Sequence, residues 1–339
     1  MMSSVVTNIY GGDEEGEEGE EGEGGRRRSK TTGKSKRQKP KKMMDDQALV
    51  KVLSSSMWFQ RLSGKNILFR QDLSDCSPTS LIGDLESRQL VRIDFGMNRI
   101  GDPGCLALAS ALKSIPGLTE LNLETNFIQE EGAASLAEIL IVQCPLRYLN
   151  LYRNKVGPKG ASKVAQALTI NTTLTWLNLS DNAINATGSI ALAEALLVNT
   201  SLTQLDIRSN MVGNQGAVAL SQALVSNTIL SFLGLDSNQI TDKGGVALAS
   251  AFLENEASAL TYLSLWNNDI QSTGAAALID SLKLNINMTS LFLEIDRANK
   301  DLDPLLKVIL DRNQHNTRMR HLTLFELLLS SSVLSGTYN

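Results

Sequence analysis

A period of 28 residues governs the apolar positions between Leu90 and Asn287. Each copy reads L-x-x-L-x-L-x-x-N-x-I/V, then has a glycine four residues later, and then reads L-A-x-A-L. The copies open at Leu90, Leu118, Leu146, Leu174, Leu202, Leu230 and Leu260, and a weaker eighth copy opens at Met288. Internal repeats of this length predict a solenoid, in which each copy stacks on its neighbours.

The apolar spacing changes within each copy. The L-x-x-L-x-L segment alternates with a period of two, which predicts a short strand with one face in the core. In the fourth copy Leu192, Ala193, Ala195 and Leu196 fall on one stripe of a helix. We expect the glycine before each stripe to allow a tight turn into the helix; these glycines are Gly104, Gly132, Gly160, Gly188, Gly216, Gly244 and Gly274.

This unit resembles the leucine-rich repeat of the ribonuclease-inhibitor type, as L-T-W-L-N-L-S-D-N-A-I from Leu174 to Ile184 shows. The resemblance implies an α/β horseshoe with parallel strands on the concave face and helices on the convex face. It also implies that the asparagine at the ninth position, such as Asn182, satisfies backbone groups inside the turn. Ran GTPase-activating proteins and the sensor domains of NOD-like receptors share this repeat, so the resemblance specifies a fold and not a function.

The repeats place four segments along the chain of 339 residues. Residues 1–42 are predicted to be a disordered tail, first acidic and then basic. Residues 43–89 are predicted to form a helical cap and a degenerate first repeat, with Ile67 to Phe69 as a strand. The leucine-rich repeat domain, of about eight units, is predicted over residues 90–315, and residues 316–339 are either a closing cap or a frayed end.

The basic half of the tail has ten bases in the seventeen residues from Arg26 to Lys42. It resembles a two-part nuclear import signal, formed by Arg26, Arg27, Arg28, Lys36, Arg37, Lys39, Lys41 and Lys42. An import receptor would then be one partner, and the protein would be cytoplasmic, nuclear or both. A nucleic-acid contact or a plain solvated tail remain as alternatives.

Aromatic residues gather at strand positions that the alternation predicts to be exposed. The third positions of the eight units are Arg92, Glu120, Tyr148, Trp176, Gln204, Phe232, Tyr262 and Ser290, and Tyr152 and Trp266 stand at seventh positions. The candidate protein-binding residues of the concave face are Tyr148, Tyr152, Trp176, Asp206, Arg208, Phe232, Asp236, Tyr262 and Trp266. We expect the partner to bridge two aromatic clusters and to offer a basic residue to Asp206 and Asp236. Alternatively, the rings lie flat between strands and stiffen the sheet.

Composition favours a binding protein over an enzyme. The chain has two histidines and three cysteines, with no metal-ligand spacing among them. We therefore expect no catalytic residues, no metal and no cofactor. No stretch approaches 18 consecutive apolar residues, so no membrane span is expected. The predicted function is a monomeric, non-catalytic scaffold that binds a protein partner, and the alternative is a Ran-type GTPase-activating protein or another regulator of a small GTPase.

Overall fold

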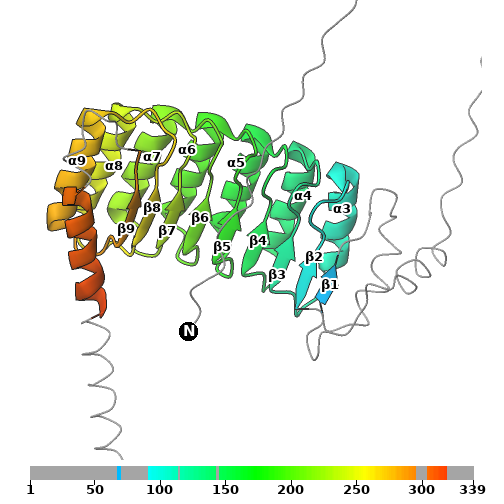
Figure 1. Cartoon of the computed structure of the whole chain (residues 1–339). Coiled ribbons are helices and arrows are strands. Elements are labelled where there is room, and N and C mark those ends of the chain that lie inside the picture. The colour runs from blue at the N-terminus through cyan, green and yellow to red at the C-terminus, as the bar shows by residue number, and fades with distance from the viewer. Residues whose placement is uncertain (1–66, 70–90, 114, 143–144, 295–303, 319–339) are drawn as a thin grey trace, which may run out of the picture. The chain divides into compact units, whose positions relative to one another are not determined.

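The computed structural model describes residues 67–69, 91–113, 115–142, 145–294 and 304–318. These residues form a sheet of nine parallel strands in sequence order, one strand per repeat (Figure 1). The strands are β1 (Ile67–Phe69), β2 (Arg92–Asp94), β3 (Glu120–Asn122), β4 (Tyr148–Asn150), β5 (Trp176–Asn178), β6 (Gln204–Asp206), β7 (Phe232–Gly234), β8 (Tyr262–Ser264) and β9 (Ser290–Phe292). The predicted strand at Ile67 to Phe69 is confirmed.

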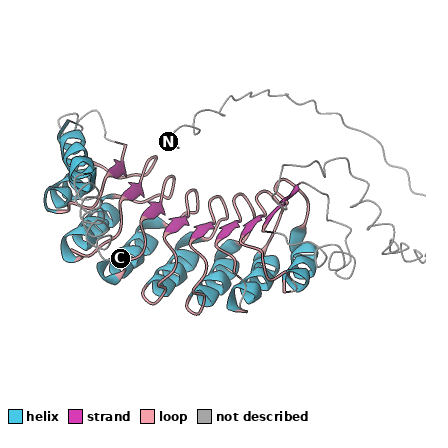
Figure 2. Ribbon diagram, turned by 90° about the horizontal axis from the view of Figure 1, so that it is seen from below, coloured by secondary structure: helices cyan, strands magenta, loops and turns pink. Residues whose placement is uncertain are grey.

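A helix follows each strand from β2 to β8 and packs on the outer side of the sheet (Figure 2). The helices are α3 (Gly101–Leu112), α4 (Glu130–Ile141), α5 (Gly157–Leu168), α6 (Asn185–Leu196), α7 (Gly213–Ser226), α8 (Asp242–Glu254) and α9 (Ser272–Leu284). A further helix covers residues 304–318. Figure 2 shows the strands on the concave side and the helices on the convex side, so the predicted α/β solenoid is confirmed.

The sheet is in register from one unit to the next. Trp176 of β5 stands beside Tyr148 of β4 and beside Gln204 of β6, and the same pairing of equivalent positions runs from β1 to β9. The core lies between sheet and helices, where Leu177 of β5 and Leu192 of α6 are fully buried. Because equivalent residues line up, each side of the sheet presents rows of side chains that cross all the strands.

The ninth-position asparagines form a buried ladder, as the family resemblance implied. The Asn182 side chain donates to the backbone carbonyl oxygens of Leu151, 2.8 Å away, and Leu179, 3.0 Å away. Its own backbone N–H donates to Oδ1 of Asn210 in the next unit, at 2.9 Å. Each asparagine thus satisfies backbone groups of two neighbouring units, because a buried polar group left unpaired is costly.

The helix-start glycines serve a different purpose from the one predicted. Gly188 lies in the first turn of α6, and its φ is not in the left-handed region. A Cβ atom built there would lie 2.9 Å from the Cβ of Ala161 on α5 and 3.1 Å from that of Ile184. The glycine therefore permits close approach of two helices. The left-handed residue stands three positions earlier, at Asn185 with φ 49°.

Only part of the predicted terminal segments lies within the described residues. The helix over residues 304–318 runs beyond the boundary at residue 315 and buries Leu306 and Ile309. The acidic and basic tail, the proposed helical cap before β1 and residues 319–339 lie outside the described residues. The import signal and the chain ends therefore stay predictions.

Candidate functional site: the concave face

The rows of concave side chains bring four of the predicted aromatic residues, Tyr148, Trp176, Phe232 and Tyr262, together in two stacked pairs. In the first, the rings of Tyr148 and Trp176 stack with centroids 3.9 Å apart and planes at 7°. Their strands are direct neighbours in register. A stack across two paired strands is compatible both with a binding surface and with the alternative in which the rings stiffen the sheet, so the two interpretations remain open for this pair. Both side chains are half-buried.

The second cluster covers the last three strands. The rings of Phe232 and Tyr262 stack with centroids 4.5 Å apart, and Phe292 packs on Tyr262 in a tilted arrangement at 5.2 Å. Phe292 was not predicted as a site residue, although it is 49% exposed. It stands at the fifth position of the eighth unit, on the same face of its strand as the third position, so strand alternation could have found it. Trp266 lies just beyond β8 and is 57% exposed.

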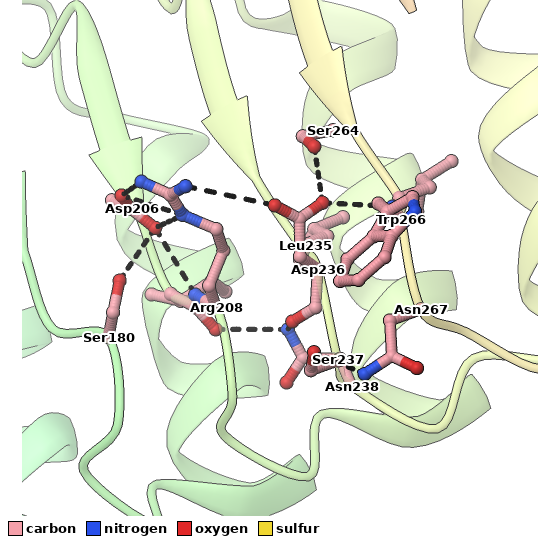
Figure 3. A network of polar contacts seen from close by, with 12 residues as sticks. Ser180, Asp206, Arg208, Leu235, Asp236, Ser237, Asn238, Ser264, Trp266 and Asn267 are labelled. Carbon is pink, nitrogen blue, oxygen red and sulfur yellow. Dashed lines mark hydrogen bonds and ion pairs between the residues drawn. The ribbon is translucent and has the colours of Figure 1, made fainter. Parts of the chain in front are cut away.

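Between the two clusters lies a network of polar contacts centred on Arg208 (Figure 3). The Arg208 guanidinium donates from Nε to both carboxylate oxygens of Asp206, at 2.8 and 3.0 Å, and its Nη2 also contacts this carboxylate. Ser180 of the preceding unit donates its hydroxyl to Asp206 Oδ1 at 2.6 Å. The hydrogen bond to Asp206 raises the pKa of Arg208, because it favours the charged guanidinium.

The network continues to Asp236, which is the seventh-position residue of the next unit. Its carboxylate accepts a hydrogen bond from the Ser264 hydroxyl and one from the backbone N–H of Trp266, the latter at 2.9 Å. Arg208 Nη1 lies 3.8 Å from Asp236 Oδ2 (Figure 3). Burial raises the pKa of Asp236 above its usual value, although both hydrogen bonds and Arg208 oppose this shift.

These contacts correct the prediction that a partner offers a basic residue to the two aspartates. Arg208 of the same chain already lies between Asp206 and Asp236. Asp206 is 3% exposed, so it is a buried support rather than a contact residue. The sequence placed all three side chains on strand positions predicted to be exposed, but position in the repeat does not show which of them pair with each other.

The N-terminal part of the concave face is mainly acidic and also internally bonded. Arg92 pairs with Glu120 of the next strand, 3.3 Å away. Asn122 donates to Asp94 at 2.9 Å, and Asn150 donates to Glu124 at 3.0 Å. These side-chain bonds link units one to three, as Arg208 links units five and six. Tyr152, predicted as a contact, is half-buried, and its N–H donates to Asn150 Oδ1 at 3.0 Å.

Other kinds of site find no support among the described residues. No group of three histidine, cysteine, aspartate or glutamate side chains in that part of the chain could hold a metal ion. None of its helices has the length and apolar character needed to cross a bilayer. Cys105 is buried, and burial raises the pKa of its thiol, so this cysteine is not a reactive group.

Comparison with known proteins agrees with this architecture. The family model described as Leucine Rich repeat matches residues 86–109, 142–165, 171–193, 198–221, 226–249 and 258–278. A search of curated proteins finds no match. Similar solved structures include actin-binding site 2 of leiomodin-1, which is 22% identical; the likeness covers 50% of this chain and 96% of that chain with a TM-score of 0.45.

Two further structures are similar at comparable levels. The tropomodulin C-terminal domain of Caenorhabditis elegans is 15% identical, with 49% of this chain and 98% of that chain covered and a TM-score of 0.43. A chain in the yeast Rad7 and Elc1 complex is 19% identical, with 73% of this chain and 58% of that chain covered and a TM-score of 0.48. At these identities and scores, none of the three likenesses bears on function. The six matched segments, together with one strand per repeat in a single parallel sheet, show that this chain is a leucine-rich repeat protein.

Proposed function

We propose that this protein is a non-catalytic scaffold that holds a protein partner against its concave face. The observation that carries the proposal is the pair of aromatic clusters, Tyr148–Trp176 and Phe232–Tyr262–Phe292, which stand on one rigid sheet. Aromatic side chains on a preformed surface are frequent anchors of protein interfaces. They offer large apolar area and lose little side-chain entropy when a partner binds.

The spacing of the clusters suggests what the partner presents. Trp176 on β5 and Phe232 on β7 are separated by one intervening strand, and neighbouring strands lie about 4.8 Å apart, so the two rings stand roughly 10 Å apart along the sheet. Two side chains seven residues apart on a helix are also separated by about 10.5 Å. We infer that an amphipathic helix of the partner crosses the strands and places one apolar side chain on each cluster.

The polar network supports this function indirectly by holding the face in one shape. Ser180, Asp206, Arg208 and Asp236 connect three consecutive units through side chains alone. When a surface is already ordered before binding, the partner does not have to order it. Less conformational entropy is then lost on binding, and the affinity is higher. We therefore expect the region between the clusters to contribute shape, while the aromatic rings contribute most of the binding energy.

Site-specific photocrosslinking in cells tests the proposal directly. A photoreactive phenylalanine at Phe232 of the full chain should capture a discrete protein partner. The same residue at Glu138, which is exposed on the convex helix α4, is the matched control. Capture from position 232 but not from position 138 supports a concave interface. Equal capture from both, or capture only from position 138, would move the partner to another surface.

The alternative, a GTPase-activating or GTPase-regulating role, makes a different prediction. A Ran-type activating protein accelerates GTP hydrolysis at amounts far below that of the GTPase. The scaffold proposal expects the purified chain to leave the rate of GTP hydrolysis by Ran unchanged. Stimulation at substoichiometric amounts would overturn the non-catalytic reading, whichever surface the GTPase contacts.

A further inference from the structure

A second apolar surface lies where the helices end, away from the concave face. It consists of large aliphatic side chains just after the last buried residue of six successive helices, and we call it the helix-end ridge. Its members, with their exposed fractions, are Ile141 (48%), Val142 (46%), Ile170 (60%), Leu197 (53%), Val198 (59%), Val225 (37%), Leu253 (50%) and Leu284 (77%).

The fold does not require apolar residues at these positions. In α6 the last core residue, Leu196, is 2% exposed, whereas Leu197 and Val198 directly after it are more than half exposed. The turn that follows is stabilised by polar contacts. Asn199 donates to the backbone oxygen of Leu168 at 2.7 Å and accepts from the backbone N–H of Leu202 at 2.7 Å. The ridge is therefore an exposed apolar row that core packing does not explain.

The area of the ridge suits a protein interface. Eight roughly half-exposed aliphatic side chains present on the order of 250–500 Å² of apolar surface, if full burial of one corresponds to about 60–120 Å². The largest apolar patch on a typical monomer is about 300–600 Å² and is often functional. A standard interface buries about 800 Å² per partner, of which somewhat more than half is apolar. The ridge supplies an apolar portion of that size.

The charges beside the ridge are unevenly distributed. The central turns, over residues 169–173, 197–201 and 225–229, contain no charged residue. Arg147 is exposed in the turn region that follows α4, and Glu254 and Glu256 are exposed at the end of α8. None of the three forms an ion pair within the part of the chain that the structure describes. The turns at the centre of the ridge are thus uncharged, with Arg147 toward one end and Glu254 and Glu256 toward the other. The last helical turns beside the ridge also contain charges: Glu138 and Glu194 are exposed, and Lys283 pairs with Asp280.

We propose that the helix-end ridge binds the ridge of a second copy of this chain, related by a two-fold axis through the turn at residues 197–201. Arg147 lies two repeats before the turn at residues 197–201, and Glu254 and Glu256 lie two repeats after it. A two-fold axis there brings Arg147 of each copy to the glutamates of the other. The pairing is self-complementary, as a two-fold contact requires.

The same axis also places an exposed apolar side chain of one ridge opposite a hollow in the other. A hollow of about 560 Å³ lies beside α4 and α5, and its lining includes Ile141, Val142 and Ile170. Leu253, 50% exposed, is the ridge residue that the axis places opposite this hollow. Leu197 and Val198 lie at the axis itself and meet their own counterparts. Each copy thus inserts a leucine into the other and receives one in return.

Dimerisation through the ridge leaves both concave faces open, because the ridge lies at the helix ends and not on the strand side (Figure 2). A partner with two binding segments could then contact both copies. Linking two sites in this way raises the overall affinity without any new contact at either concave face. This inference is independent of the proposed function, because the ridge shares no residue with the aromatic clusters.

Sedimentation velocity of the full chain over a wide concentration range tests the proposal. We expect a reversible monomer–dimer equilibrium. Leu197→Glu places two carboxylates at the axis and should raise the dimer Kd at least about tenfold. Leu106→Glu is the matched control, because Leu106 is 58% exposed on α3, outside the ridge, and should leave the Kd unchanged. A chain that stays monomeric at all concentrations, or a dimer indifferent to Leu197→Glu, would overturn the proposal.

A charge exchange tests the two-fold arrangement itself. Arg147→Glu should weaken the dimer by about tenfold, because it sets like charges against Glu254 and Glu256. Adding Glu256→Arg should restore much of the loss. All variants should melt at the temperature of the parent, since these side chains are exposed. If Arg147→Glu weakens the dimer and the added Glu256→Arg does not restore its affinity, this two-fold axis is excluded.

Discussion

The helix starts and the concave face use the same repeat in opposite ways. At the helix starts every unit from Gly104 to Gly274 has the same residue, and at Gly188 a Cβ would approach Ala161 within 2.9 Å. On the concave face the third position changes from unit to unit, as with Trp176 beside Gln204. Positions that must fit the next unit repeat, whereas positions that face solvent are free to differ.

This contrast separates stability from binding. A substitution at a helix start disturbs the contact between two units, and the solenoid has no other means of burying its core. A substitution of an exposed concave ring removes surface that a partner would contact, and it leaves the contacts between units in place. The two regions should therefore respond to mutation with different readouts, and variants can be ranked by how strongly they disturb each one.

The largest effect is expected for Gly188→Val. The added side chain must displace Ala161 or Ile184, whose Cβ atoms would lie 2.9 and 3.1 Å from its own Cβ. Overpacking typically costs about 1–3 kcal/mol, and a stiff β-branched side chain against a neighbouring helix should reach the upper end of this range. Chemical denaturation should show a loss of about 3 kcal/mol. Unfolding like that of the parent would show that the helices can separate without cost.

A matched control distinguishes close approach from backbone freedom. Gly213 has φ 61°, and a Cβ there would meet nothing within 4 Å. The equivalent residue of the preceding unit is Asn185, which adopts φ 49° with an ordinary side chain. Gly213→Asn should therefore change the free energy of unfolding by only a few tenths of a kcal/mol, because asparagine tolerates this conformation. A large loss would mean that glycine is needed there for another reason.

Removal of the Arg208 side chain is expected to have the next largest effect. Arg208→Met leaves the Asp206 carboxylate buried without its cation. Breaking a buried ion pair costs about 3–5 kcal/mol. Because the Arg208 side chain is 43% exposed, we expect a smaller loss in denaturation experiments, about 2–3 kcal/mol. Asp206→Asn in the Arg208→Met background should recover part of this loss. Without recovery, a buried charge would not be the cause.

The repeat made most of the fold predictable before the structure. Strand positions such as Trp176 to Asn178 followed from alternation, and helices such as Asn185–Leu196 followed from the change to a helical period. The position of each glycine was also correct. Its role was not, because spacing locates a small residue but does not tell whether φ or a neighbouring helix demands it. In the structure Asn185, and not Gly188, adopts the left-handed conformation.

Contacts within the candidate site could be predicted from the sequence only where two side chains occupy equivalent positions in neighbouring repeats. Tyr148 and Trp176 were expected to lie close together because they occupy equal positions in successive units, and their rings stack. The pairing of Arg208 with Asp206 and Asp236 did not, because it depends on side-chain rotamers across one strand and its neighbour. Phe292 was not predicted because it stands at the fifth position of its unit, whereas the aromatic residues predicted on the concave face stand at third and seventh positions.

Substitutions of the exposed aromatic residues on the concave face should lower the stability less than substitutions at the helix starts, but they should lower the affinity for the partner more. Trp266→Ala should weaken partner binding at least about tenfold, because truncating an interface anchor costs about 2 kcal/mol or more. Trp176→Ala should do the same and also lose about 0.5–1.5 kcal/mol of stability with its stack on Tyr148. The readout is the Kd for the protein captured by crosslinking, with Glu138→Ala as the control. Unchanged affinity with lower stability would make these rings structural.

The smallest change in stability is expected for Asp236→Asn, and its sign depends on pH. The folded-state pKa of Asp236 is raised because burial disfavours the carboxylate. Ionisation therefore costs folding free energy: the penalty is absent below the unfolded pKa, about 3.9, and complete once pH exceeds the folded pKa. An asparagine oxygen can still accept from Ser264 and from the N–H of Trp266.

The variant should consequently be somewhat less stable than the parent in acid and should gain on it as pH rises past about 4. At neutral pH the two should agree within about 0.5 kcal/mol, since the variant gives up only the Arg208 contact at 3.8 Å. Denaturation at a series of pH values measures this difference. A loss of 2 kcal/mol or more at neutral pH would show that the ion pair with Arg208 outweighs burial, and that Asp236, like Asp206, is a charged support of the concave face.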